Sequence, residues 1–224
     1  METAQTSAAE RFTTLGGLKT VFVRPERCIG CRQCEFACAL EHSMSRDPAR
    51  APWESPAPHA RIHVEAGFAM NSSFPNRCHH CDPAPCEQAC PTAAIYRDRE
   101  LGLVLVEPAK CIACAMCAMV CPFDVITFYP MAANGHARIA AVKCDGCLER
   151  VSRGGIPACA EACKVGALVY GELNEILRQE RALESRVVLA ASGAALAELS
   201  RAPENVAGWR QWGNEASRVA GGLR

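Results

Sequence analysis

Four closely spaced groups of cysteines constrain the fold of this chain more than any other feature of its sequence. All sixteen cysteines belong to one of these groups, and none is left over. Sixteen cysteines in 224 residues is far above ordinary usage, so cysteine chemistry dominates what the chain can become. The groups are Cys28, Cys31, Cys34, Cys38; Cys78, Cys81, Cys86, Cys90; Cys111, Cys114, Cys117, Cys121; and Cys144, Cys147, Cys159, Cys163.

The spacing inside the groups is itself repeated. The first and third groups read C-x2-C-x2-C-x3-C, the second reads C-x2-C-x4-C-x3-C, and the fourth has an eleven-residue gap in its middle. Pro91 and Pro122 follow the second and third groups, whereas Ala39 and Lys164 follow the first and fourth. Short β-branched runs at 21–23, 103–106 and 139–142 predict strands that lead into cysteine loops. Small-residue segments after the loops predict single helical turns.

This spacing suits an iron–sulfur cubane. Three cysteines at C-x2-C-x2-C can wrap one cluster in a tight loop whose backbone amides face the sulfides. The fourth cysteine lies on the following turn, and in the bacterial two-cluster arrangement it ligates the other cluster. One C-x-x-C would be unspecific, but four quartets predict four [4Fe–4S] clusters. A [3Fe–4S] centre at one site is an alternative, although no cysteine is replaced to indicate it.

Other uses of cysteine fit the sequence less well. Structural zinc sites use two separated C-x2-C pairs rather than three cysteines within seven residues. Disulfide frameworks belong to small secreted chains, and the opening METAQTSAAERFTTLGG has no apolar segment or twin arginine of an export signal. The longest apolar stretch, at 187–199, is too short to span a bilayer. We therefore expect a cytoplasmic protein with no direct membrane span.

Several residues near the cysteines could tune bound clusters. A base precedes the first cysteine of each group, and its charge could favour the reduced cluster or could simply point into solvent. These bases are Arg27, Arg77, Lys110 and Lys143, and Lys164 is a similar case. Because each cysteine set is complete, we expect His79 and His80 to form hydrogen bonds or lie exposed rather than bind metal. The other histidines are isolated and predict nothing.

With the four groups in this order, the chain resembles the four-cluster ferredoxin-like electron-transfer subunits of multisubunit oxidoreductases. That family includes iron–sulfur subunits of formate dehydrogenases, formate hydrogenlyase and dimethyl sulfoxide reductase-type enzymes, and the iron–sulfur protein that accompanies nickel carbon monoxide dehydrogenase. The resemblance covers residues 19–172. The stretches RPERCIGCRQCEFACALEH and FPNRCHHCDPAPCEQACPTAAI look closest to soluble carbon monoxide dehydrogenase and hydrogenase partners.

The ligand exchange of that family, carried over to this chain, implies four ligand sets. In each set the last cysteine of one group completes the cluster of another group. The implied sets are Cys28, Cys31, Cys34 with Cys163; Cys78, Cys81, Cys86 with Cys121; Cys111, Cys114, Cys117 with Cys90; and Cys144, Cys147, Cys159 with Cys38.

The resemblance also implies an α+β fold of two interlocked two-cluster ferredoxin-like domains, with short strands and helices around the clusters. Residues 70–130 would form the inner domain, and residues 19–69 with 131–172 the discontinuous outer domain. Residues 1–18 would be a flexible N-terminus. Residues 173–224 would be a C-terminal helix and tail, an arm that could dock a partner. Packing around clusters would replace part of the apolar core, in keeping with seven Phe, three Tyr and three Trp.

The expected function is a non-catalytic relay of anaerobic metabolism that passes electrons between a catalytic oxidoreductase subunit and an acceptor protein. The sequence has no Rossmann fingerprint, no P-loop and no spare cysteine for a nickel or molybdenum centre. A partner of carbon monoxide dehydrogenase, hydrogenase or formate dehydrogenase type is favoured. A tungsten or molybdenum aldehyde-oxidising or other oxidoreductase, and a free polyferredoxin shuttle, are the alternatives. Equal numbers of acidic and basic residues argue against nucleic-acid binding.

Overall fold

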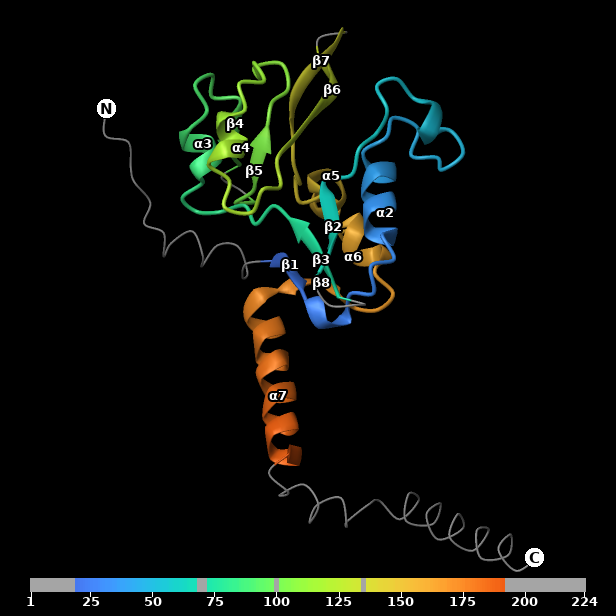
Figure 1. Cartoon of the computed structure of the whole chain (residues 1–224), viewed down its shortest axis with the longest axis vertical. Helices are drawn as coiled ribbons and strands as arrows, with labels where there is room; N and C mark the ends of the chain where they lie inside the picture. The colour runs from blue at the N-terminus through green and yellow to red at the C-terminus, as the bar shows by residue number, and fades with distance from the viewer. Residues whose placement is uncertain (1–18, 68–71, 99–100, 134–135, 192–224) are drawn as a thin grey trace, which may run out of the picture. The chain divides into compact units, whose positions relative to one another are not determined.

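The computed structural model describes residues 19–67, 72–98, 101–133 and 136–191 (Figure 1). The chain divides into two units, Met1–Leu173 and Asn174–Arg224, and every cysteine lies in the first. The predicted N-terminal segment, and the part of the predicted C-terminal tail from residue 192 onward, lie outside the described residues.

The described strands pair two by two into four small antiparallel sheets. Three of these sheets join strands that are neighbours in the sequence, whereas β1 and β8 come from opposite ends of the first unit (Figure 1). Their register places Val21 opposite Tyr170. The pairs are β1 (Lys19–Val23) with β8 (Leu168–Glu172), β2 (Ile62–Ala66) with β3 (Ser73–Arg77), β4 (Ile95–Arg97) with β5 (Val104–Val106), and β6 (Thr127–Ala133) with β7 (His136–Val142). The predicted strand runs lie in β1, β5 and β7.

The helices of the first unit are short. They are η1 (Pro25–Arg27), α2 (Gln33–Glu41), η2 (Ala51–Trp53), α3 (Pro85–Gln88), α4 (Met116–Met119), α5 (Leu148–Ser152) and α6 (Ala158–Ala162). The single turn predicted from the small-residue segment of the third group is confirmed, whereas the one predicted for the first group is wrong, because that segment lies in a helix of nine residues. Helix α2 contacts α6 and β2, while α3 contacts α4 and β4 (Figure 1). Helix α7 (Leu173–Ala191) covers the described part of the helix expected at 173–200.

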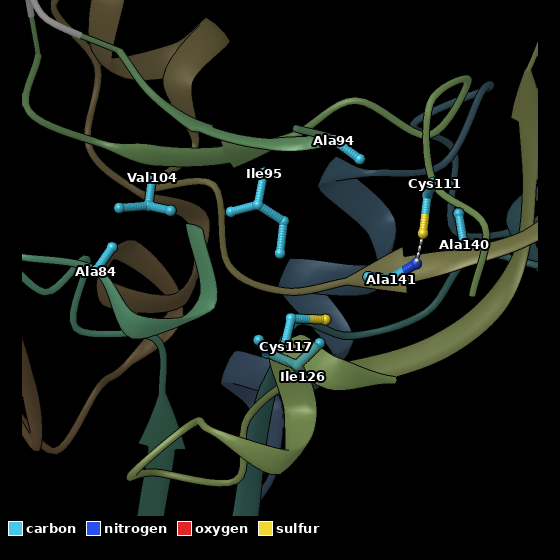
Figure 2. Packing of buried hydrophobic residues seen from close by; sticks show 9 residues of the cluster. All are labelled: Ala84, Ala94, Ile95, Val104, Cys111, Cys117, Ile126, Ala140 and Ala141. Carbon is cyan, nitrogen blue, oxygen red and sulfur yellow. Dashed lines mark hydrogen bonds between the residues drawn. The ribbon is translucent and has the colours of Figure 1, made fainter. Parts of the chain in front are cut away.

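Two groups of buried residues form the core, and cysteines belong to both. The first is shown in Figure 2 and consists of Ala84, Ala94, Ile95, Val104, Cys111, Cys117, Ile126, Ala140 and Ala141. The second consists of Val21, Cys34, Cys38, Ile62, Val64, Cys159 and Leu168. In the first group small alanines and thiols predominate, whereas the second group combines three thiols with Val21, Ile62, Val64 and Leu168. The result is a small mixed α/β fold of short elements, compatible with a ferredoxin-like fold.

Candidate metal centres

The first C-x-x-C of every group folds into the same loop. The residue two positions after the first cysteine has a positive φ in all four groups: Gly30 (69°), His80 (51°), Ala113 (55°) and Gly146 (70°). In the last three groups its backbone N–H donates to the Sγ of the first cysteine at 3.4 Å. Left-handed turns of this kind direct backbone N–H groups into a concavity that favours anions. Each loop is therefore shaped to receive a negatively charged sulfur group.

The last cysteine of three groups begins a second shared turn. Ala93, Asp124 and Gly166, three residues later, all have a positive φ, and each donates its N–H back to the carbonyl of that cysteine at 3.3–3.4 Å. Lys164 stands where the other two turns have proline, and the turn is retained. In the first group Cys38 lies instead within α2, which continues through Ala39. The first group, in which Ala39 stands in place of this proline, therefore ends inside a longer helix.

The structure brings the cysteines of the second and third groups together at two pockets. In each pocket three cysteines of one group meet the last cysteine of the other, which is the combination implied by the resemblance. One pocket is lined by Cys78, Cys81, Cys86 and Cys121, and the other by Cys90, Cys111, Cys114 and Cys117. The N–H of Ala141 in β7 also donates to Cys111 Sγ at 3.4 Å (Figure 2).

Cysteines of the first and fourth groups also approach one another. Burial raises the pKa of Cys38 well above its ordinary value, and the nearby Cys144, Cys159 and Cys147 raise it further. Burial raises the pKa of Cys34 to about 11; the backbone N–H of Glu35 opposes this rise, and the charges of Glu35 and Cys163 add to it. Cys28 and Cys163 pack against the second core group. Cys31 is the exposed member of this part of the site.

Burial keeps many of these thiols protonated when no metal is bound. It raises the pKa of Cys117 and of Cys147 to about 11 and raises that of Cys159 further. Cys90 is the opposite case: partial burial raises its pKa, but hydrogen bonds from Ile95 and Thr92 outweigh this effect and lower it. Iron binds thiolate, so metal binding must release protons and offset the cost of buried charge.

His80 supplies a buried donor beside the pocket of Cys78. Val104 N–H donates to His80 Nδ1 at 3.1 Å, so the ring proton lies on Nε2, which is buried and has no partner. Burial, together with the charges of Lys143 and Arg77, lowers the pKa of His80 to about 3. A neutral donor without an acceptor beside four thiols fits a [4Fe–4S] cluster, whose sulfurs accept hydrogen bonds. His79 instead packs against Phe123, with ring centroids 4.1 Å apart.

A polar network that the sequence did not reveal anchors the loop of the fourth group. Asp145 accepts from Arg61 Nη1 at 2.7 Å and from Cys147 N–H at 2.9 Å, and it lies 3.1 Å from His42 Nε2. His42 Nδ1 is 2.7 Å from the carbonyl of Cys38. Burial raises the pKa of Asp145, but the His42 hydrogen bond and the Arg61 charge prevail and hold it well below its usual range. The three side chains come from distant positions, so no local motif could have identified them.

Comparison with known proteins identifies the family. Residues 70–173 match the 4Fe–4S dicluster domain family. The iron-sulfur protein of Rhodospirillum rubrum is 37% identical over 173 residues, which cover 73% of this chain and 89% of that protein. This chain belongs to the family of 4Fe–4S iron–sulfur electron-transfer proteins. Clusters of the 4Fe–4S type are therefore its cofactors, as the cysteine spacing predicts.

Other members of the family are similar over the same part of the chain. Electron transport protein HydN of Escherichia coli K12 is 36% identical over 159 residues, 67% of this chain and 86% of HydN. A tetrathionate reductase subunit of Salmonella typhimurium is 32% identical over 150 residues, 66% of this chain but only 56% of the relative. The match thus spans little more than half the length of that relative. Within the described ranges, no helix is both long enough and apolar enough to cross a bilayer.

Proposed function

We propose that this chain holds four [4Fe–4S] clusters and relays electrons between a catalytic oxidoreductase subunit and an acceptor protein. The observation that carries the proposal is the lining of the two pockets formed by the second and third groups. In each pocket three cysteines of one group meet the last cysteine of the other. A bound [4Fe–4S] cluster takes up and releases single electrons. The residues of this chain would ligate the clusters, donate hydrogen bonds to their sulfurs and set the charge around them.

The proposed ligand sets are the four implied by the resemblance. The approach of Cys38 to Cys144, Cys147 and Cys159, and of Cys34 to Cys163, supports the two sets that join the first and fourth groups. The pairing of β1 with β8 and the contact of α2 with α6 support a discontinuous outer half. The pairing of β4 with β5 and the contact of α3 with α4 support an inner half. We propose that the two halves interlock.

The partner is proposed from the relatives and from the sequence. The tetrathionate reductase relative is by name one subunit of an oxidoreductase, and HydN is by name an electron transport protein. These names support a non-catalytic subunit that serves a separate catalytic chain. Carbon monoxide dehydrogenase, hydrogenase or formate dehydrogenase in the cytoplasm is the favoured type of partner. A tungsten or molybdenum oxidoreductase, or a free shuttle between several enzymes, is the second candidate.

The proposal is tested by anaerobic purification of the tagged chain from cells that encode it. We expect a catalytic chain in equal amount and, after addition of the substrate of that chain, bleaching of the iron–sulfur absorbance. Purification of the chain alone, with bleaching by several unrelated enzymes, would favour the free shuttle. Zinc in place of iron would overturn the relay altogether.

A further inference from the structure

The four bases that precede the first cysteines divide into two kinds. Arg27 and Lys110 are exposed over 41% and 56% of their side chains, and each pairs with a nearby glutamate. Arg77 and Lys143 are only 4% and 3% exposed. Within the described ranges, no carboxylate lies within ion-pair distance of either buried base. The same sequence position therefore carries a solvated charge in two groups and a buried charge in the other two.

Arg77 is held by neutral oxygens. Its Nη2 donates to Val21 O at 2.8 Å and to Thr20 Oγ1 at 3.0 Å, and its Nη1 donates to Cys78 O at 3.1 Å. The same Nη1 lies 4.0 Å from Cys144 Sγ, and the buried Nε has no partner. The guanidinium thus extends from the second cysteine group to a thiol of the fourth group while one of its donors is unused.

Lys143 directly precedes the fourth cysteine group, and its charge also reaches the second group. Its Nζ donates to Cys144 O at 3.1 Å and to Val104 O. Its charge acts on Cys78 and Cys86 by lowering their pKa against the larger effect of burial. The charge of Arg77 acts in the same way on Cys159. Each cation therefore lies close enough to influence cysteines at the junction of the second and fourth groups.

Two buried cations without a carboxylate would be costly unless another anion lay beside them. The thiols around them belong to the proposed sets of Cys78 and of Cys144, and a cluster ligated by four thiolates is an anion. Reduction adds a further negative charge to a cluster, and a buried positive charge favours that state. Exposed charges such as Arg27 and Lys110 act much less because water and salt screen them.

We propose that Arg77 and Lys143 are buried positive charges at the junction of the two halves and that they raise the reduction potentials of two clusters. One is the cluster ligated by Cys78, Cys81, Cys86 and Cys121, and the other is the cluster ligated by Cys144, Cys147, Cys159 and Cys38. This inference rests on the proposed function. Electrons that enter the chain would then accumulate on these two clusters before they leave it.

The experiment is an EPR-monitored redox titration of the intact iron-loaded protein. Lys143→Gln and Arg77→Gln should each shift two of the four midpoint potentials downward. At a fixed potential the reduced-to-oxidised ratio of those clusters should fall about tenfold, the order expected for loss of a nearby charge at an intermediate dielectric constant. Lys110→Gln and Arg27→Gln remove the equivalent exposed bases and should leave all four potentials within error of the parent protein.

A second pair of variants separates charge from structure if the glutamine variants lose iron. Thr20→Asp would place a carboxylate beside Arg77 and preserve the arginine, whereas Thr20→Asn is a neutral control of similar size. Thr20→Asp should lower the same potentials, and Thr20→Asn should not. Equal shifts in the aspartate and asparagine variants, or in the buried and exposed base variants, would overturn the inference. Failure of the proposed function would be distinguishable, because the parent protein itself would then not show four one-electron centres.

Discussion

Cys90 and Cys121 are the residues on which the cluster assignment depends most. Each is the last cysteine of its own group, yet each lines the pocket of the other group. The proposed exchange makes Cys90 a partner of Cys114 and not of Cys81, although Cys81 is nearer in the sequence. This pairing can be tested by measuring iron content. Two substitutions within one ligand set can remove only one cluster, whereas substitutions in two different sets remove two clusters.

We predict that Cys90→Ser combined with Cys114→Ser removes no more iron than either single variant, about four atoms. Cys90→Ser combined with Cys81→Ser should remove about eight atoms, because the two residues then belong to different clusters. Iron and acid-labile sulfide are measured on anaerobically purified protein. The reverse pattern, with additive loss for Cys90 and Cys114, would show that each group keeps its own fourth cysteine.

The sequence identified the cysteines and the bases that precede them, but it did not indicate which of these bases are buried or which distant residues lie beside the cysteines. Arg77 and Arg27 follow the same local pattern, and only packing makes one buried and the other exposed. Asp145 and His42 carried no signal because their partners lie far along the chain. Cysteine spacing is predictable because ligand geometry restricts it locally. Charges and hydrogen bonds around the cysteines depend on which distant segments meet, and local sequence patterns do not reveal these meetings.

At the scale of elements, the unit repeated in all four groups is a loop with a left-handed residue two positions after the first cysteine, rather than a helix or strand. Gly146 and Ala113 take the same positive φ, although only glycine does so without strain. The sequence predicted the strands before the first, third and fourth groups but not β3 before the second, and the single helical turn predicted after the first loop is part of the longer helix α2. The pairing of β1 with β8 had no local signal, since nearly the whole first unit separates the two strands. Only the resemblance to a known family implied that the two ends of this unit belong to one half.

Helix α7 and the residues after it are predicted to be unnecessary for cluster binding, because every cysteine lies in the unit that ends at Leu173. A chain of residues 1–173 should retain the full iron content and the EPR signals of the complete protein. If the C-terminal segment is a docking arm, the shortened chain should no longer co-purify with the catalytic partner. Loss of about four or more iron atoms on truncation would contradict this division of roles.

At the scale of the whole molecule, the cofactor and the core cannot be separated. Cys111 and Cys117 belong to one buried group, and Cys34, Cys38 and Cys159 belong to the other. The other members of these groups are alanine, valine, isoleucine and leucine. Because the cysteines that would ligate the clusters are part of the core, ligation energy would supply part of the free energy of folding.

Anaerobic removal of iron with a chelator and a reductant should accordingly unfold the first unit. We expect most of the circular dichroism of its strands to disappear, and reconstitution with iron and sulfide to restore it. Helix α7 lies mainly in the other unit, and its signal should be less affected. Retention of a cooperative thermal transition by the iron-free chain would mean that the apolar core suffices without clusters.

In the proposed relay, one chain carries four [4Fe–4S] clusters. The most direct test is the measurement of iron and acid-labile sulfide per chain, with Mössbauer spectra of the same anaerobic sample. We predict about sixteen atoms of each, with every iron in a [4Fe–4S] environment. About eight atoms of each would restrict the clusters to one half of the chain, and zinc in place of iron would contradict the account as a whole.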